Sequence, residues 1–90
     1  MQTIDIVVSN KLGLHARAAA KLTQLAGRYA DCELFISRGA QRVNAKSIMG
    51  VMMLAAGLGV TVRIVAQGPS ASQALEEIRA LFDSKFGESE

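Results

Sequence analysis

The 90 residues form one small chain in which half of the residues are hydrophobic and a fifth are charged, a composition typical of a globular domain and not of a disordered one. A net charge of only +2, three Phe, one Tyr and no Trp argue against a nucleic-acid-binding protein, which usually carries a concentrated basic patch or aromatic platform. One Cys and one His supply neither a disulfide nor the usual zinc ligands, so the sequence predicts no metal, no other cofactor and a reducing, cytoplasmic location.

We also expect neither secretion nor membrane insertion. The first residues lack a basic leader followed by an apolar block and a cleavage site. The longest nearly apolar run, residues 48–60, is well short of the roughly 20 residues that span a bilayer. The prediction is a single, monomeric domain over residues 1–90, without repeats or linkers.

In the first half of the chain, apolar residues recur first at every second position, then about every 3.6 positions, and then at every second position again. Residues 3–8 alternate apolar and polar side chains and predict a strand, and a turn-like SNKLG follows. From Ala16 the apolar positions take a helical spacing. Residues 32–37 and 41–44 then predict a β-hairpin, and Gly39 allows its tight turn.

A short second helix and a fourth strand come next. KSIMGVMMLAAG predicts a helix that Ser47 caps and that stops near Gly57. Residues 60–67 alternate again and predict a strand.

The last predicted helix begins at a capping box formed by Ser70 and Gln73. Its buried stripe is expected to be Leu75, Ile78, Leu81, Phe82 and Phe86. The resulting order is βαββαβα. Because the connections are short, we expect an α+β domain with three helices on one face of a four-stranded, mainly antiparallel sheet.

His15 precedes the predicted start of the first helix. As the N-cap residue it would be followed by the backbone N–H groups of Ala16, Arg17 and Ala18, which have no carbonyl partner within the helix. Free amides, the positive end of the helix dipole and the Arg17 guanidinium together suit a phosphate group. A neutral imidazole is a nucleophile, so the pattern is consistent with covalent phosphorylation of His15.

Two alternatives stay open at this point. His15 is in register with Leu22 and Ala26, so it could instead be a hydrogen-bonded residue on the apolar face of the helix. A hydrolase would need a base or metal to aim water, but the acids nearest in sequence, Asp5 and Asp31, lie on other predicted elements. We therefore expect a carrier without turnover of its own.

The segments GLHARAAAKL and KSIMGVMMLAAGLG, at this separation, resemble the HPr family of histidine-containing phosphocarriers of the phosphotransferase system, over nearly the whole chain. The resemblance implies an open-faced β-sandwich. It also implies that His15 accepts a phosphoryl group on Nδ1 from phosphoenolpyruvate-charged enzyme I and passes it to an enzyme IIA, with Arg17 beside the phosphate.

Ala18 departs from the family pattern, which usually has proline at this position in the first helical turn. Ala18, the ending LFDSKFGESE and the Met-rich second helix look more like the nitrogen-related NPr branch than the sugar-transport branch. That branch implies nitrogen-type enzyme I and IIA homologues as partners and a regulatory output.

Ser47 has two interpretations. Serine is a good N-cap, and its removal typically costs about 1 kcal/mol. The resemblance implies in addition that Ser47 is a regulatory site for a dedicated serine kinase/phosphorylase, because a phosphate there would repel an acidic partner.

The second helix has more apolar residues than one buried face accommodates. Val51 and Leu54 are the predicted core positions. The resemblance implies that the other apolar residues and nearby polar ones of the first helix form a partner-binding face: Ile48, Met49 and Met52, framed by Lys21, Gln24 and Arg28. An ordinary solvated face is the alternative for Lys21 and Arg28.

Two other functions compete with the carrier. One is a regulatory protein that acts by docking alone, through the Met-rich helix and modulated by phosphorylation of Ser47. The other is a ligand-sensing α+β domain, which only the expected architecture suggests.

Overall fold

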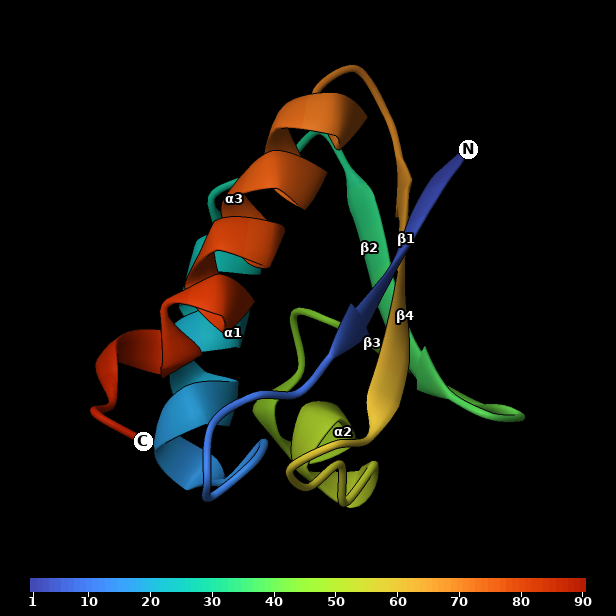
Figure 1. Ribbon diagram of the computed structural model, residues 1–90. Helices are drawn as coiled ribbons and strands as arrows, with labels where there is room; N and C mark the ends of the chain where they lie inside the picture. Colours follow the sequence, from blue (N-terminus) through green and yellow to red (C-terminus); the bar gives the residue numbers. More distant parts are fainter.

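The computed structural model describes residues 1–90 and shows one antiparallel four-stranded sheet, in the order β1-β4-β2-β3, with helices on one of its faces (Figure 1). In chain order the elements are β1 (Gln2–Val7), α1 (Ala16–Gly27), β2 (Glu33–Arg38), β3 (Gln41–Asn44), α2 (Ile48–Met53), β4 (Thr61–Gln67), α3 (Ala71–Asp83) and a short 3₁₀ turn, η1 (Lys85–Gly87). The predicted fold class and element order are confirmed.

The core lies between the sheet and the helices. In the register of the sheet, Ile64 of β4 faces Ile4 of β1 on one side and Ile36 of β2 on the other. Ile36 and Ile64 are fully buried, as are Leu22 of α1 and Ile78 of α3. The apolar faces of the strands and of the helices therefore pack against one another in a single layer.

The second helix is shorter than predicted and ends at Met53, not near Gly57. Its last turn tightens, and Ala55 takes the left-handed conformation, with φ 50°. The carbonyl of Ala56 then accepts a hydrogen bond from Leu14 N at 2.9 Å. This bond ties the segment after α2 to the loop before α1.

The predicted capping box of the last helix is wrong. Ser70 does occupy the N-cap of α3, but its hydroxyl makes no capping bond and donates instead to Asp31 Oδ2 at 2.9 Å. The preceding turn packs closely, since a Cβ on Gly68 would overlap the backbone of Asp31 and Cys32. This packing places the Ser70 hydroxyl beside the Asp31 carboxylate.

The predicted stripe of the last helix is right for Leu75, Ile78 and Phe82, which are buried on α3. Phe86 is also buried, but it belongs to η1, after the end of α3. Its ring packs edge-on against Phe82, with 4.8 Å between ring centroids. Positive φ angles at Lys85 and Phe86 turn the chain back toward the start of α1 (Figure 1).

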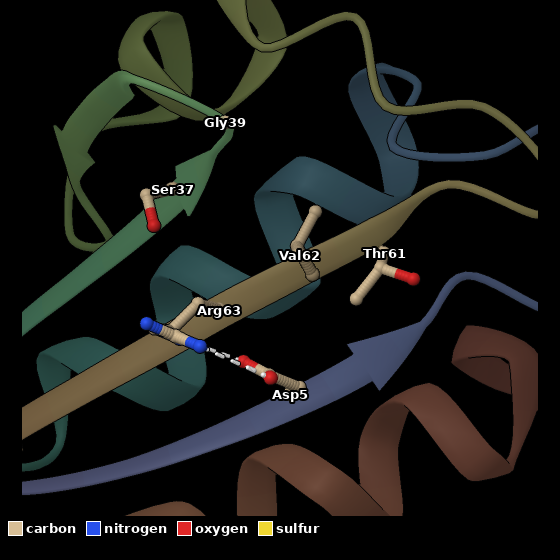
Figure 2. A pocket seen from close by; sticks show the side chains of 6 residues that line it. All are labelled: Asp5, Ser37, Gly39, Thr61, Val62 and Arg63. Atoms are coloured by element: carbon tan, nitrogen blue, oxygen red, sulfur yellow. Dashed lines mark hydrogen bonds and ion pairs between the residues drawn. The ribbon is translucent and has the colours of Figure 1, made fainter.

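The other face of the sheet carries no helix. Figure 2 shows a hollow there in which Arg63 of β4 pairs with Asp5 of β1, with 2.8 Å between Arg63 Nε and Asp5 Oδ1. None of the residues predicted to form a functional site lines this hollow. None of the helices has the length and apolar character that a membrane span requires.

Candidate functional site

His15 is the N-cap residue of α1, as predicted. Its backbone is extended (φ −74°, ψ −179°), and its carbonyl accepts the first helical hydrogen bond, from Ala19 N at 2.8 Å. The imidazole makes no capping bond to the helix. The side chain is therefore available for contacts outside the helix.

The backbone amides that follow His15 have no acceptor in the chain. The first amide of α1 with a partner is that of Ala19, so the N–H groups of Ala16, Arg17 and Ala18 donate to no protein oxygen. Arg17 is exposed, and its guanidinium makes no ion pair within the chain. The three unpaired amides lie at the positive end of the helix, and phosphate binding by them and by Arg17 stays a prediction.

The imidazole is neither buried in the core nor free in solvent. The His15 side chain is 27% exposed and lines a shallow hollow together with Leu14 and the segment that follows α2. The alternative of a core histidine on the apolar face is therefore wrong.

Gly13 and Asn10 shape the loop that presents His15. Gly13 has φ 66°, and a Cβ at this position would lie 2.6 Å from the carbonyl oxygen of Ala56. Asn10 is completely buried, and its Nδ2 donates to the carbonyl of Gly13 at 2.8 Å. The loop is thus held by Ala56 on one side and Asn10 on the other.

A carboxylate that the sequence did not predict lies against the histidine. Glu88 Oε2 is 2.5 Å from His15 Nε2, and Glu88 Oε1 accepts from Asn10 Nδ2 at 3.1 Å. The sequence argument against a nearby acid covered only residues close to His15 along the chain, and Glu88 lies outside that range. No local signal reveals the contact, because 73 residues separate the two partners in sequence.

The surroundings of Glu88 favour its charged form. The hydrogen bond with His15, and after it the one with Asn10, lower the pKa of the Glu88 carboxyl below its ordinary 4.5. Because the pKa of Glu88 is lowered, this contact stabilises the folded protein fully at pH values above the ordinary pKa of 4.5. The stabilisation is lost as the pH falls through the lowered pKa of the folded state.

The segment that carries Glu88 is anchored on both sides of it. Phe86 is fully buried, and its carbonyl accepts from Lys21 Nζ at 2.5 Å. Beyond Glu88, the backbone of Glu90 accepts from Lys11 N at 3.0 Å, and their side chains pair at 3.4 Å.

The Met-rich helix divides as predicted between core and surface. Val51 and Leu54 are buried, and Ser47 caps the helix by accepting from Gly50 N at 3.1 Å. The remaining apolar residues form an exposed patch on α2, which we call the α2 patch: Ile48, Met49, Met52 and also Met53, which the sequence reasoning did not single out.

The polar residues expected to frame this patch lie elsewhere on α1. Lys21, Gln24 and Arg28 line a hollow together with Leu25 and with Leu81 of α3, on the side of α1 that meets α3. Lys21 is in addition engaged by the carbonyl of Phe86. The frame prediction is therefore corrected for Lys21, which supports the segment after α3.

Comparison with known proteins decides between a carrier and the other functions. Residues 2–84 match the family model described as "PTS HPr component phosphorylation site". The chain belongs to the HPr family of phosphocarrier proteins. Among its relatives, the phosphocarrier protein HPr of Cupriavidus necator is 54% identical over 86 residues, 96% of each chain.

Two further relatives of this HPr-family protein agree with the assignment. The phosphocarrier protein NPr of Shewanella violacea is 44% identical over 84 residues, which cover 93% of this chain and 91% of that one. The crystal structure of an HPr from Thermoanaerobacter tengcongensis superposes with a TM-score of 0.95 at 38% identity and covers 100% of both chains. The fold is thus that of an HPr phosphocarrier.

Proposed function

We propose that this HPr-family phosphocarrier accepts a phosphoryl group on His15 from enzyme I charged by phosphoenolpyruvate and passes it to an enzyme IIA. The observation that carries the proposal is the partly exposed imidazole at the N-cap of α1 beside three backbone amides without acceptors. Amides and a guanidinium at that position bind the oxygens of a phosphoryl group on the ring.

The chemistry needs only the ring and its donors. A lone pair of the imidazole attacks the phosphorus, the bond to the donor breaks, and its electron pair leaves with the donor. Ala16, Arg17 and Ala18 stabilise the transferred group through their amides, and Arg17 adds its guanidinium. The product is a phosphoramidate, which gives its phosphoryl group to an acceptor nucleophile in the same way.

We assign partner binding to the α2 patch and, as a separate polar region on the side of α1 that meets α3, to Gln24 and Arg28. Methionine side chains adapt to surfaces of different shape, which suits a protein that meets a donor and an acceptor in turn. Ser47 lies at the start of this helix and is exposed, so a serine kinase could reach its hydroxyl, and a phosphate there would add negative charge beside the patch.

The nitrogen-related branch is our proposal for the partners, with a monomer in the cytoplasm as the acting form. Ala18 and the relationship to the NPr of Shewanella violacea support it, whereas the HPr of Cupriavidus necator is more similar in sequence. Competition between nitrogen-type and sugar-type enzyme I for this protein tests the branch. Faster phosphorylation by the sugar-type enzyme would refute it.

The decisive experiment is phosphorylation by enzyme I and phosphoenolpyruvate, followed by intact-mass spectrometry. We expect an acid-labile gain of about 80 Da that is lost in His15→Ala. Ser72→Ala, at the far end of α3, is the matched control and keeps the gain. Labelling that persists in His15→Ala would remove His15 from the mechanism, and partner binding that depends on Met49 but not on His15 would favour the docking-only function.

A further inference from the structure

The contact between Glu88 and His15 joins two side chains that are both largely withdrawn from water. The exposed fractions are 15% for Glu88 and 27% for His15, and 2.5 Å separates Oε2 from Nε2. A hydrogen bond in such a place is less exposed to competition from water than one on an open surface. It therefore constrains the protonation of the ring.

We infer that Glu88 is a positioning residue that selects Nδ1 of His15 as the phosphoryl acceptor. This inference rests on the proposed function and deepens it. An ionised carboxylate only accepts hydrogen bonds, so the nitrogen facing it, Nε2, must carry the proton. A neutral imidazole has one proton, which leaves the lone pair on Nδ1.

The carboxylate is itself held in a fixed orientation. Asn10 Nδ2 donates both to the carbonyl of Gly13, at 2.8 Å, and to Glu88 Oε1, at 3.1 Å. Because a carbonyl only accepts, the Asn10 amide cannot turn its oxygen toward Gly13 without losing that bond. Glu88 Oε1 is thus committed to Asn10, and Oε2 alone faces His15.

The backbone on either side supports this placement. The buried ring of Phe86 and the bond from Lys21 Nζ to its carbonyl fix the chain before Glu88. The bond from Lys11 N to the carbonyl of Glu90 fixes it afterwards. The match to the family model ends at residue 84, before the segment that carries Glu88.

The contact also accounts for the proton during transfer. Nδ1 attacks the phosphorus of a phosphoramidate donor, the donor P–N bond breaks, and its electron pair returns to the donor nitrogen. The proton stays on Nε2, so the phosphorylated ring is a cation that faces the Glu88 carboxylate. When the group moves on, the Nδ1–P pair returns to the ring and restores the neutral form, without any proton transfer.

Two substitutions at Glu88 test whether its carboxylate sets the tautomer of His15: one removes the hydrogen-bond acceptor and the other replaces it with a donor. Glu88→Ala removes the acceptor and should give a mixture of the two imidazole tautomers. Glu88→Gln must present its amide oxygen to Asn10 and its NH₂ to His15, which favours the tautomer with the proton on Nδ1. Glu90→Gln changes the charge of the same segment without touching His15 and is the matched control.

The tautomer is read from the ¹⁵N chemical shifts of the neutral ring. We expect a proton on Nε2 in the unmodified protein and in Glu90→Gln, a mixture in Glu88→Ala and a proton on Nδ1 in Glu88→Gln. This measurement does not depend on phosphorylation. An unchanged tautomer in both Glu88 variants would overturn the inference.

Reaction with potassium phosphoramidate, followed by ³¹P NMR, tests the consequence for transfer. Labelling of Nδ1 should fall by about 10- to 100-fold in Glu88→Ala and at least as much in Glu88→Gln. Equal rates and the same labelled nitrogen in all variants would refute the role of Glu88. Absence of label on His15 in every protein, with enzyme I as well as with phosphoramidate, would instead refute the proposed function.

Discussion

Two serines at helix N-caps show how much a single side-chain bond decides. Ser47 accepts from Gly50 N at 3.1 Å, whereas Ser70 makes no bond to its own helix and donates to Asp31. Both fit the same preference for serine at the N-cap. The segment packed beside each serine, not the residue type, determines which of the two hydroxyls accepts a hydrogen bond from a helix amide.

Ser47→Ala should therefore lower the free energy of unfolding by about 1 kcal/mol, because it leaves the Gly50 amide without its acceptor. Ser70→Ala removes only an exposed hydrogen bond and should cost less, within about 0.5 kcal/mol. Urea denaturation of both variants at neutral pH measures the difference. Equal losses would show that the cap of α2 contributes nothing specific.

At the scale of elements, the loop before α1 depends on a close approach to the end of α2. The Gly13 backbone packs so tightly against Ala56 and Gly57 that a Cβ there would lie 2.6 Å from Ala56 O and 2.7 Å from Gly57 Cα. The same approach allows the bond between Leu14 N and Ala56 O. The position of His15 is therefore set jointly by two elements.

Gly13→Ala should destabilise the protein by about 2 to 5 kcal/mol, since it combines a positive φ with steric overlap. Gly39→Ala is the matched control, because Gly39 also has positive φ, 57°, but a Cβ there meets nothing within 4 Å. We expect it to cost about 1 to 2 kcal/mol from backbone strain alone. Denaturation midpoints compare the two, and similar losses would contradict the role of the close approach.

Elements with a strong local pattern could be predicted from the sequence. The hairpin around Gly39, the four strands and the start of α1 directly after His15 follow from periodicity and turn residues. The early end of α2 could not, because the apolar run continues through Ala56 and the first residue there that favours a helix stop is Gly57.

The candidate site divides in the same way. Its local half, the amides after His15, could be predicted from helix geometry alone. Its other half, Glu88 with Asn10, forms only when the segment after α3 folds back over the start of α1. The sequence contains no periodic signal for that contact.

At the scale of the whole molecule, two hydrogen bonds connect α1 and the turn after it with α3 and the segment beyond it. Near the end of α1, Tyr29 donates its phenolic hydrogen to Glu77 Oε2 of α3 at 2.5 Å. From the middle of α1, the Lys21 ammonium donates to the carbonyl of Phe86, beyond α3. A separate pair on the sheet responds to acid: the hydrogen bond to Arg63 lowers the pKa of Asp5. The Asp5–Arg63 pair therefore stabilises the folded protein at pH values above the ordinary pKa of Asp5, and this stabilisation is lost in acid, as it is for Glu88.

The stability contributed by Tyr29 is lost at alkaline pH, whereas that of Asp5 and Glu88 is lost in acid. The hydrogen bond to Glu77, and after it burial, raise the pKa of Tyr29 from 10.0 to about 12. Below pH 10 both the folded and the unfolded chain keep the phenolic proton, and the contact contributes fully. As the pH rises from about 10 toward 12, the unfolded chain releases this proton while the folded one keeps it, so stability falls.

Tyr29→Phe keeps the buried ring and removes this ionisation. We expect the unmodified protein to exceed Tyr29→Phe in free energy of unfolding at pH 8, and the difference to shrink steadily above pH 10. Burial also raises the pKa of Cys32, but that thiol is present in both proteins and contributes to both curves. Urea titrations at several values between pH 8 and 12 give the comparison. A difference that stays constant over this range would show that Tyr29 and Glu77 do not couple the two helices through a shared proton.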